Sequence, residues 1–405
     1  MDGKKQFWKG LAVGFAVTLI LVEAAIFGGK VLDRVKQSTA DSPQADLTND
    51  AVEEKLEEIE ALMNSYYLEE IDPEQVESYL YKGAVAGLGD IYAAYYTEEE
   101  YQSLIDSTNG SYCGIGVEIS QNMTTGIITV TRVFEGTPAM EAGLLPGDIL
   151  YKVEDQEVTG EDLTKVVTCI KGEENTEVSV TILRDGEEDY REFRVERRTI
   201  EVPTVAYEML EDQIGYIAIA SFDDVTSSQF IAALEELEGQ GMKALVVDLR
   251  NNGGGLVSSV CAILDRLLPE GLIVYTEDKY GNREEQTSDA EHYFDKPLVV
   301  LVNENSASAS EIFAGAIKDY GTGTLVGTKT FGKGIVQKIF PLSDGTAVKL
   351  TVSKYYTPNG NNIHGIGIEP DVEVELNEEL KNEVVIPKES DNQLQEAVGI
   401  LKKNQ

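Results

Sequence analysis

"PLVVLVNENSASASEIFAGAI", residues 297–317, is the stretch that decides the fold of the larger part of this chain. It opens on an apolar run that is typical of a buried strand, and Ile312, Phe313 and Ala316 then recur at helical spacing. The small residues of "NSASASE" between them therefore form a strand-to-helix turn, with a helix that begins near Ser308. Because the first N–H groups of a helix have no partner within it, this turn can take a capping side chain or stabilise an anion.

Strands and helices alternate around this stretch. Strand-like runs are "GYIAIASF" (215–222), "KALVVDLR" (243–250) and "GLIVYTED" (271–278), and helix-like segments such as "SSQFIAALEELEGQG" lie between them. This alternation indicates right-handed crossovers and a mainly parallel sheet. Ligands bind at the carboxyl ends of the strands in such sheets, so we expect "NNGGG" (251–255) and "NSASASE" at one site.

A different pattern precedes this α/β region. From about residue 114 to 194, short β-branched runs such as "GIITVTRVF" and "EVSVTILRDG" are separated by glycine, proline and aspartate turns. With "GTPAMEAGL" and "GDILYKVEDQEV", this part resembles a PDZ domain. Its "GIGV" loop, Gly114, Ile115, Gly116 and Val117, can turn successive N–H groups toward the carboxylate of a peptide that adds as an edge strand. The resemblance therefore implies a peptide-binding site at these four residues.

The N-terminal part contains no chemistry that we can identify. Residues 10–29 are apolar except for Glu23 and follow three lysines, which is typical of a signal peptide or an uncleaved membrane anchor. We therefore expect an extracytoplasmic protein, secreted or membrane-anchored, in a cell envelope of bacterial type. A polar linker follows, and helical spacing of Val52, Leu56, Ile59 and Leu62 then predicts a helical module.

Composition excludes several classes of function. The chain has 33 basic and 72 acidic residues, a formal net charge of −39, which argues against a nucleic-acid partner. Its cysteines, Cys113, Cys169 and Cys261, form neither a disulfide framework nor a metal motif, so we expect no metal and no cofactor. A serine in "SASAS" could be a nucleophile, but Ser308 and Glu311 also fit the S-x-x-E pattern of a helix cap.

A nucleophilic serine needs a base, and histidines are scarce. His292 lies in a charged segment and His364 in a polar turn, so neither is expected to orient toward a serine. Lys333 lies in "TFGKGIVQKIF" between glycines and apolar residues, and no acidic residue occurs between positions 324 and 342. Burial there would lower the lysine pKa and make it a base. Gln337 follows four residues later and could hold the amine without adding charge.

Several motifs in this order resemble the C-terminal processing peptidases, a family of PDZ-containing serine proteases: "DLRNNGGG", "NENSASASEIFAGAIKDYG", "GTKTFGKGIVQ" and "GIGIEPDVEV". The resemblance implies that Ser308 is the nucleophile, Lys333 the general base and Gln337 the group that positions the lysine. It also implies an oxyanion hole formed by the N–H groups of Gly255 and Ala309. The acidic element usual ahead of the PDZ domain appears here as "DIYAAYYTEEEY" (90–101), a departure that we expect to affect domain packing more than chemistry.

The sequence thus predicts a multidomain α+β and α/β protein. Residues 1–36 are the signal peptide or anchor, 37–50 a linker, 51–105 the helical region, 106–197 the PDZ domain, 198–375 the serine protease core, and 376–405 an extension with a terminal helix. The resemblance implies a serine endopeptidase that cleaves proteins after the PDZ domain recognises an apolar C-terminal tail, and pairing of two copies through N- and C-terminal helices. The competing hypothesis is a non-catalytic, membrane-anchored PDZ adaptor.

Overall fold

A computed structural model describes residues 45–187, 189–289, 291–381 and 386–404. The expected signal peptide or anchor, residues 1–36, lies outside these ranges. Within them, no helix has the length and apolar character needed to span a bilayer. The chain divides into two units, Met1–Val76 and Glu77–Gln405.

The described part of the first unit is dominated by helix α2 (Asp50–Tyr66). Asn49 caps it by accepting from the N–H of Val52 at 3.1 Å. No residue of α2 is buried, and Leu56, Ile59 and Leu62 are exposed at helical spacing. Helix α3 (Pro73–Ala86) crosses from the first unit into the second.

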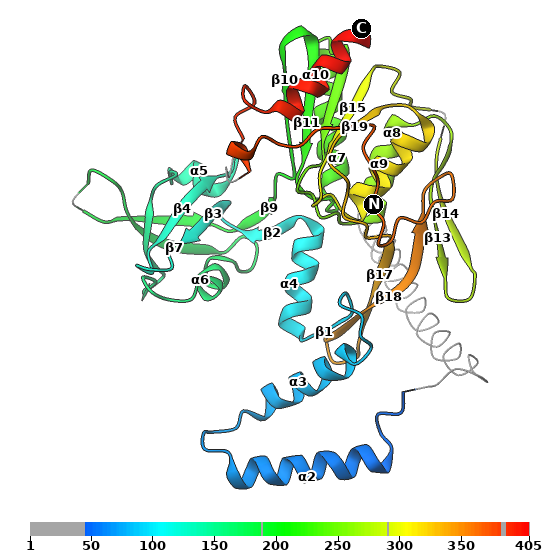
Figure 1. The fold of residues 1–405 in the computed structure, drawn as a ribbon. Coiled ribbons are helices and arrows are strands. Elements are labelled where there is room, and N and C mark those ends of the chain that lie inside the picture. The colour runs from blue at the N-terminus through cyan, green and yellow to red at the C-terminus, as the bar shows by residue number, and fades with distance from the viewer. Residues whose placement is uncertain (1–44, 188, 290, 382–385, 405) are drawn as a thin grey trace, which may run out of the picture. The chain divides into compact units, whose positions relative to one another are not determined.

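The second unit continues with β1 (Ala94–Tyr96), α4 (Glu98–Asn109) and β2 (Ser111–Gly114). A five-stranded antiparallel path follows, in the order β3 (Val117–Gln121), β4 (Ile128–Val133), β5 (Ile149–Val153), β7 (Glu177–Leu183) and β8 (Arg191–Glu196), with β6 (Gln156–Glu157) paired to β5. Helices α5 (Pro138–Ala142) and α6 (Leu163–Ile170) complete this domain (Figure 1). The chain leaves it through β9 (Arg198–Glu201), which pairs with β2.

A six-stranded sheet forms the framework of the part that follows β9. Its order is β10 (Val205–Met209), β11 (Ile214–Ile219), β12 (Ala244–Asp248), β15 (Leu298–Val302), β16 (Thr324–Gly327) and β19 (Val372–Glu373). The pair β10 and β11 is antiparallel, with the short helix η1 (Glu211–Gln213) between them, and the other four pairs are parallel. Every residue of β12 and β15 is buried, because helices cover both faces.

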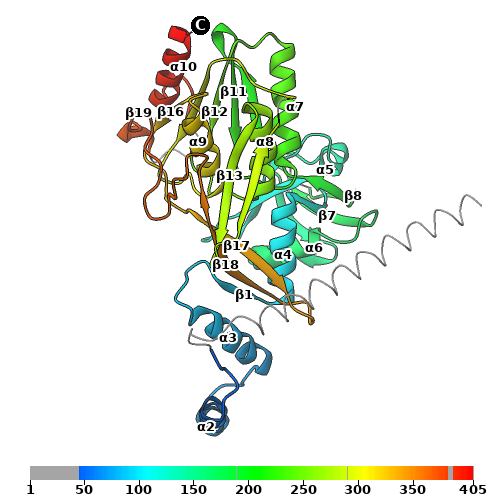
Figure 2. The ribbon, with the colours of Figure 1, turned by 90° about the vertical axis from the view of Figure 1, so that its right-hand side faces the viewer.

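The two faces of this sheet contact different helices (Figure 2). Residues such as Leu245, Val247 and Val300 pack with α7 (Thr226–Gly239), α8 (Val257–Leu267) and α9 (Ala309–Tyr320). Their neighbours along the strands pack instead with α10 (Asn392–Asn404), which follows the short helix η2 (Glu378–Leu380). Leu394 and Leu401 of α10 are buried there, so this face is not available to a second copy of the chain.

A second sheet of this part is antiparallel. Its order is β1, β18 (Ala347–Tyr356), β13 (Gly271–Asp278) and β14 (Arg283–Ser288), and β17 (Ile335–Pro341) also pairs with β18. The run "GLIVYTED", expected among the alternating strands of the parallel sheet, is β13 of this sheet instead. The reason is its hairpin with β14 and its antiparallel pairing with β18. Through β1, this sheet also pairs the segment that precedes the β3–β8 domain with β18.

Candidate active site

Three neighbouring parallel strands, β12, β15 and β16, end at one edge of the sheet, and the loops that follow them are joined. The N–H of Ala307 donates to the carbonyl of Asn252 at 3.0 Å, and the N–H of Phe331 donates to the carbonyl of Ser306 at 3.1 Å. The loop after β15 therefore contacts both of its neighbours. "NNGGG", "NSASASE" and the loop of Lys333 meet at this edge.

Burial distinguishes the three serines of "SASAS". Ser306 and Ser310 are fully buried, and their hydroxyls donate to the carbonyls of Leu249 and Asn252 at 2.8 and 2.9 Å. Both hydroxyls therefore stabilise the contact between the loops. Ser308 is only partly buried, which makes it the serine that a substrate can reach.

Ser308 has an unusual backbone conformation at the N-terminus of α9. Its φ is 55° and its ψ −112°, a region that costs a residue with a side chain about 1–3 kcal/mol. The hydroxyl of Tyr355 donates to its carbonyl at 3.1 Å. On the other side, a Cβ on Gly254 would lie 2.8 Å from the Cβ of Ser308 and 2.9 Å from the nitrogen of Ala309, so only glycine fits there. A strained strand-to-helix turn can hold a serine hydroxyl where it is accessible.

Glu311 joins the serine loop to the lysine loop. Its side chain is fully buried, and Oε2 accepts from the N–H groups of Ser308 at 3.0 Å and Lys333 at 2.8 Å. Oε1 accepts from the Thr330 hydroxyl at 2.6 Å and from the N–H of Gly332 at 2.8 Å. The capping pattern predicted only the contact with Ser308. The other three contacts could not be predicted from the sequence. The one feature that pointed to a structural role of Glu311 was its position on an otherwise apolar helix face.

Lys333 lies between β16 and β17 and is partly buried. Burial lowers its pKa, the charge of Lys349 lowers it further, and Asp90 opposes both by raising it. Its Nζ lies 4.7 Å from the centre of the Tyr92 ring. Within the described ranges no carboxylate forms an ion pair with this amine, and it is not hydrogen-bonded to Ser308. The structure thus brings the two predicted residues together through Glu311 rather than through their side chains.

Asp90 and Tyr92 change the interpretation of the segment at 90–101. The sequence suggested that this segment affects domain packing more than chemistry, but its tyrosine contacts the predicted base and its aspartate raises the pKa of that base. A hydrogen bond from Thr351 lowers the pKa of Asp90, and the N–H of Tyr92, at 2.9 Å, lowers it too. No acidic residue lies near Lys333 in the sequence. The acid that approaches it in space is Asp90, which precedes the PDZ domain in the sequence, whereas Lys333 follows it.

Among the described residues, no hydrogen bond joins Gln337 to Lys333. It lies on β17 next to a register shift, and its amide Nε2 is 3.5 Å from the hydroxyl of Thr351. His364 lies nearer to the site than its polar turn suggested, since a Cβ on Gly334 would lie 2.5 Å from its backbone nitrogen. The His364 side chain is exposed.

The two residues predicted for the oxyanion hole carry N–H groups that find no acceptor among the described residues. Ala309 is the first residue of α9. Gly255, with a φ of 145°, forms a bridge with Phe222, whose carbonyl would lie 2.3 Å from a Cβ at this position. Gly254, which the sequence did not single out, is the glycine in direct contact with Ser308. Free N–H groups at a helix N-terminus can stabilise a developing oxyanion.

Arg250 stabilises the loop after β12 from the opposite side. Its guanidinium pairs with Asp248 at 2.6 Å and with Asp391 at 2.7 Å, and all three side chains are nearly buried. The hydroxyl of Tyr216 also donates to Asp248 at 2.8 Å. Asp391 immediately precedes α10, so this network connects the catalytic loop to the C-terminal helix. No group of three or more residues able to bind a metal ion occurs in the described ranges.

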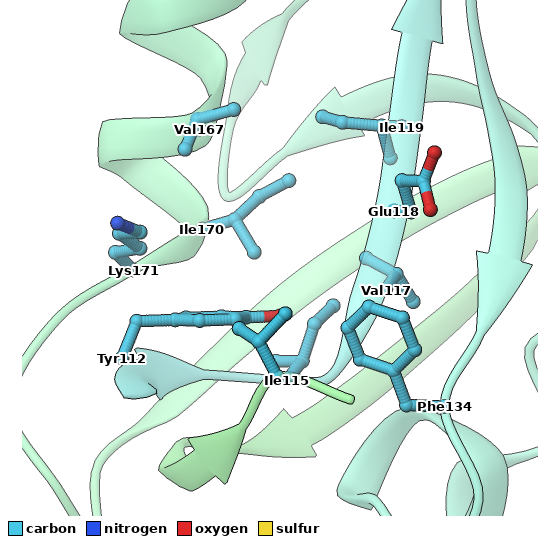
Figure 3. Close-up of a pocket in the computed structure, with 10 residues that line it drawn as sticks. Tyr112, Ile115, Val117, Glu118, Ile119, Phe134, Val167, Ile170 and Lys171 are labelled. Atoms are coloured by element: carbon cyan, nitrogen blue, oxygen red, sulfur yellow. The ribbon is translucent and has the colours of Figure 1, made fainter. Parts of the chain in front are cut away.

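Ile115 and Val117 of the predicted peptide-binding loop line a groove of about 310 Å³ (Figure 3), and Gly114 and Gly116 are not among the residues that line it. Val117 and Ile119 of β3 form one wall, and Val167 and Ile170 of α6 face them from the other side. Ile115 lies at the end of this groove. The loop is held in place because the N–H of Ala139 donates to the Ile115 carbonyl at 2.9 Å, and because Gly116, with a φ of 88°, packs against Thr137.

Comparisons with known proteins identify the family of this chain. The model of the family described as Peptidase family S41 matches residues 213–374, and a PDZ domain model matches residues 129–184. The carboxy-terminal processing protease CtpB of Bacillus subtilis is 35% identical over 374 residues, which is 90% of this chain and 78% of that protein. A carboxyl-terminal-processing protease of Synechocystis is 39% identical over 307 residues, 75% of this chain and 71% of that protein.

Among solved structures, the photosystem II D1 C-terminal processing protease is similar, with 31% identity, a TM-score of 0.46, and coverage of 79% of this chain and 86% of that chain. The identity with the Bacillus relative extends over most of both proteins and shows the family. The resemblance that the sequence motifs suggested is therefore confirmed. The chain belongs to peptidase family S41, as a PDZ-containing serine-type peptidase of the carboxy-terminal processing group.

Proposed function

We propose that this protein hydrolyses peptide bonds through an acyl-enzyme on Ser308, with Lys333 as the general base. The observation that supports this most directly is Glu311, which binds the backbone of both residues and so positions two loops from different strands as one unit. The pKa of Lys333 is lowered, first by burial, so its neutral amine is more accessible to base catalysis than that of an ordinary lysine.

In the proposed reaction, neutral Lys333 takes the hydroxyl proton as Ser308 Oγ attacks the peptide carbonyl. The N–H groups of Gly255 and Ala309 receive the charge that develops on the carbonyl oxygen. Lys333 then gives the proton to the leaving amine, and a water activated by the same amine hydrolyses the ester. No metal or cofactor takes part.

The lysine side chain has to move for this reaction to start. In the structure its amine lies over the ring of Tyr92 and makes no hydrogen bond with Ser308. We infer that the side chain leaves the ring for the serine in the active state, where Gln337 holds it by a hydrogen bond. The loop backbone need not move, because Glu311 already binds it.

We further propose that the groove of the PDZ domain binds the apolar C-terminal tail of a protein substrate. Its walls are aliphatic, and Phe134 lies beside the loop "GIGV" at its end (Figure 3). An apolar side chain of the tail would lie in the groove while its carboxylate meets the N–H groups of the loop.

The placement of the protein in the cell and its assembly are also proposals. The apolar run between Leu11 and Val22 supports an extracytoplasmic protein with a cleaved or uncleaved N-terminal segment. The exposed Leu56, Ile59 and Leu62 support pairing of two copies through α2. Replacing these three residues by glutamate is expected to convert a dimer to a monomer in sedimentation, and an unchanged mass would contradict pairing at this face.

The test of the catalytic proposal uses an unfolded protein that ends in an apolar tail. The wild-type chain should cleave it, and Ser308→Ala and Lys333→Met should each lower the rate to background, while Ser306→Ala should retain part of the activity if it folds. Equal cleavage by wild type and Ser308→Ala would contradict the proposal. Binding of the tail without cleavage by the wild type would favour the alternative of a PDZ adaptor.

A further inference from the structure

A tyrosine of this chain lies in the place where a peptide would end. Tyr112 belongs to β2 and lines the same groove as Ile115, Val117 and Ile170. Figure 3 shows its ring extended along the end of the groove, below Ile170, with the hydroxyl oxygen beside Ile115. The ring thus points along the groove floor toward the loop "GIGV".

Contacts on both sides of the ring hold it in this position. A Cβ on Gly114 would lie 2.7 Å from Cε2 of Tyr112, so the absence of a side chain at Gly114 makes room for the ring. The amine of Lys171, at the end of α6, lies 5.2 Å from the ring centre. A lysine over an aromatic face is attracted by the electrons of the ring.

The N–H of Val117 points into the groove that holds the tyrosine oxygen. Phe134 donates to the carbonyl of Gly116 at 3.0 Å, and Val117 lies opposite Val133. This is the pattern of a non-hydrogen-bonded antiparallel pair, in which the N–H of Val117 points away from β4 and into the groove. Burial raises the pKa of Tyr112 to about 12, and the N–H groups of Val117 and Gly116 oppose this rise by donating to the hydroxyl oxygen.

We propose that the hydroxyl of Tyr112 occupies the carboxylate site of the unliganded PDZ domain, so that a C-terminal tail binds only by displacing this side chain. The proposal rests on the proposed function of the groove. The peptide carboxylate would take over the N–H groups of Gly116 and Val117, and Lys171, released from the ring, would lie close enough to compensate its charge. A protein segment without a free carboxylate cannot make this exchange, so the tyrosine selects for true chain ends.

The test measures binding of a labelled apolar peptide to the full chain with Ser308→Ala, which prevents cleavage. The peptide is used with a free carboxylate and with a C-terminal amide. Tyr112→Phe keeps the ring but removes the oxygen that competes for the two N–H groups. We expect the free-acid peptide to bind this variant roughly tenfold more tightly than the chain with Tyr112, and the amide to bind nearly equally to both.

The matched control is Tyr190→Phe, an exposed tyrosine of the same domain that stacks on Tyr151 outside the groove. It should leave both affinities unchanged. Unchanged or weaker binding of the acid by Tyr112→Phe would overturn the inference. If neither the chain with Tyr112 nor Tyr112→Phe binds the acid more tightly than the amide, the groove does not recognise a carboxylate. That outcome contradicts the proposed function of the groove as well as the inference about Tyr112.

A second measurement uses the tyrosine itself and does not depend on the folding of a variant. Nitration of the Ser308→Ala chain by tetranitromethane, followed by peptide mapping, reports how accessible Tyr112 is. The free-acid peptide should increase nitration of Tyr112 several-fold, and the amide should not. Protection of Tyr112 by the bound acid would mean that the side chain stays in the groove and would contradict displacement.

Discussion

At the scale of single residues, the site includes side chains that take no direct part in the proposed reaction. Local composition makes Ser308 and Lys333 candidates, with small residues around one and glycines without nearby acids around the other, and the resemblance to the peptidase family supplies their proposed roles. Asp90 and Tyr92 could not be predicted, because the fold alone brings their segment to the lysine through β1 and β18. Sequence patterns relate residues that are close in the sequence, whereas Asp90 and Tyr92 are far from Lys333 in the sequence.

Lys333 is expected to set the dependence of activity on pH. Its pKa is lowered, so the neutral amine is present at lower pH than for a free lysine, and activity should rise with pH through this pKa. Asp90 raises the pKa, so Asp90→Asn should move the rise in kcat/KM to lower pH. Asp155→Asn, an exposed carboxylate of the PDZ domain, is the control. A shift to higher pH would contradict this role of Asp90.

Glu311→Gln is expected to inactivate the enzyme while it still folds. The variant replaces one acceptor oxygen by an NH₂ group that faces donors, and hydrogen bonds to a charged group contribute about 1.5–3 kcal/mol each. We expect kcat to fall by about 100-fold or more, because both loops shift, together with a lower melting temperature. Glu304→Gln, an exposed residue that accepts from Thr328, should change neither quantity much. Full activity of Glu311→Gln would show that Glu311 does not position the two loops.

At the scale of elements, the catalytic loops are organised by the strand ends of one sheet. The strand-to-helix turn at Ser308 follows from the pattern of residues 297–317, so the position of α9 could be predicted. The membership of β13 in a second sheet could not, because an apolar strand has the same pattern whichever partner it pairs with. The Gly255 bridge to Phe222 is likewise a contact between segments that no local pattern connects.

The glycines after β12 offer a test at this scale. A methyl group on Gly254, which has a φ of 105°, would collide with the backbone of Ala307 and with Ser308, so Gly254→Ala should abolish cleavage. The strain is expected to lower the free energy of unfolding by about 1–3 kcal/mol. Gly253→Ala is the matched control, because nothing lies within 4 Å of its Cβ. Equal loss of activity in both variants would mean that the loop tolerates no change at all, rather than that Gly254 makes room for Ser308.

At the scale of the whole second unit, the C-terminal helix belongs to the catalytic part. The sequence predicted a terminal helix with Leu394 and Leu401 on one face, and the structure buries that face against the chain's own sheet. The pattern predicts an apolar face but cannot say which surface covers it. The ion pair of Arg250 with Asp391 fixes the start of the helix to the loop that carries the glycines.

Asp391→Asn is therefore expected to destabilise the whole catalytic part. Removing one partner of a buried ion pair costs up to about 3–5 kcal/mol. Arg250 keeps Asp248 as a counterion in this variant, so we expect a cost toward the lower end of that range. Asp212→Asn breaks the exposed pair with Lys402 on the same helix and should cost less than about 1 kcal/mol. Urea unfolding of the two variants measures the difference. Equal midpoints would contradict the assigned role of the Arg250 network.

The pairing of β2 with β9 places the entry and the exit of the PDZ domain side by side, with Ser111 opposite Glu201. A domain whose N- and C-termini lie close together can be replaced by another domain with the same spacing of its termini, because the rest of the chain is joined to it at only two points. With the tail recognition proposed above, grafting a PDZ domain of another preference between these strands should redirect the protease to new protein tails and leave its hydrolytic chemistry intact.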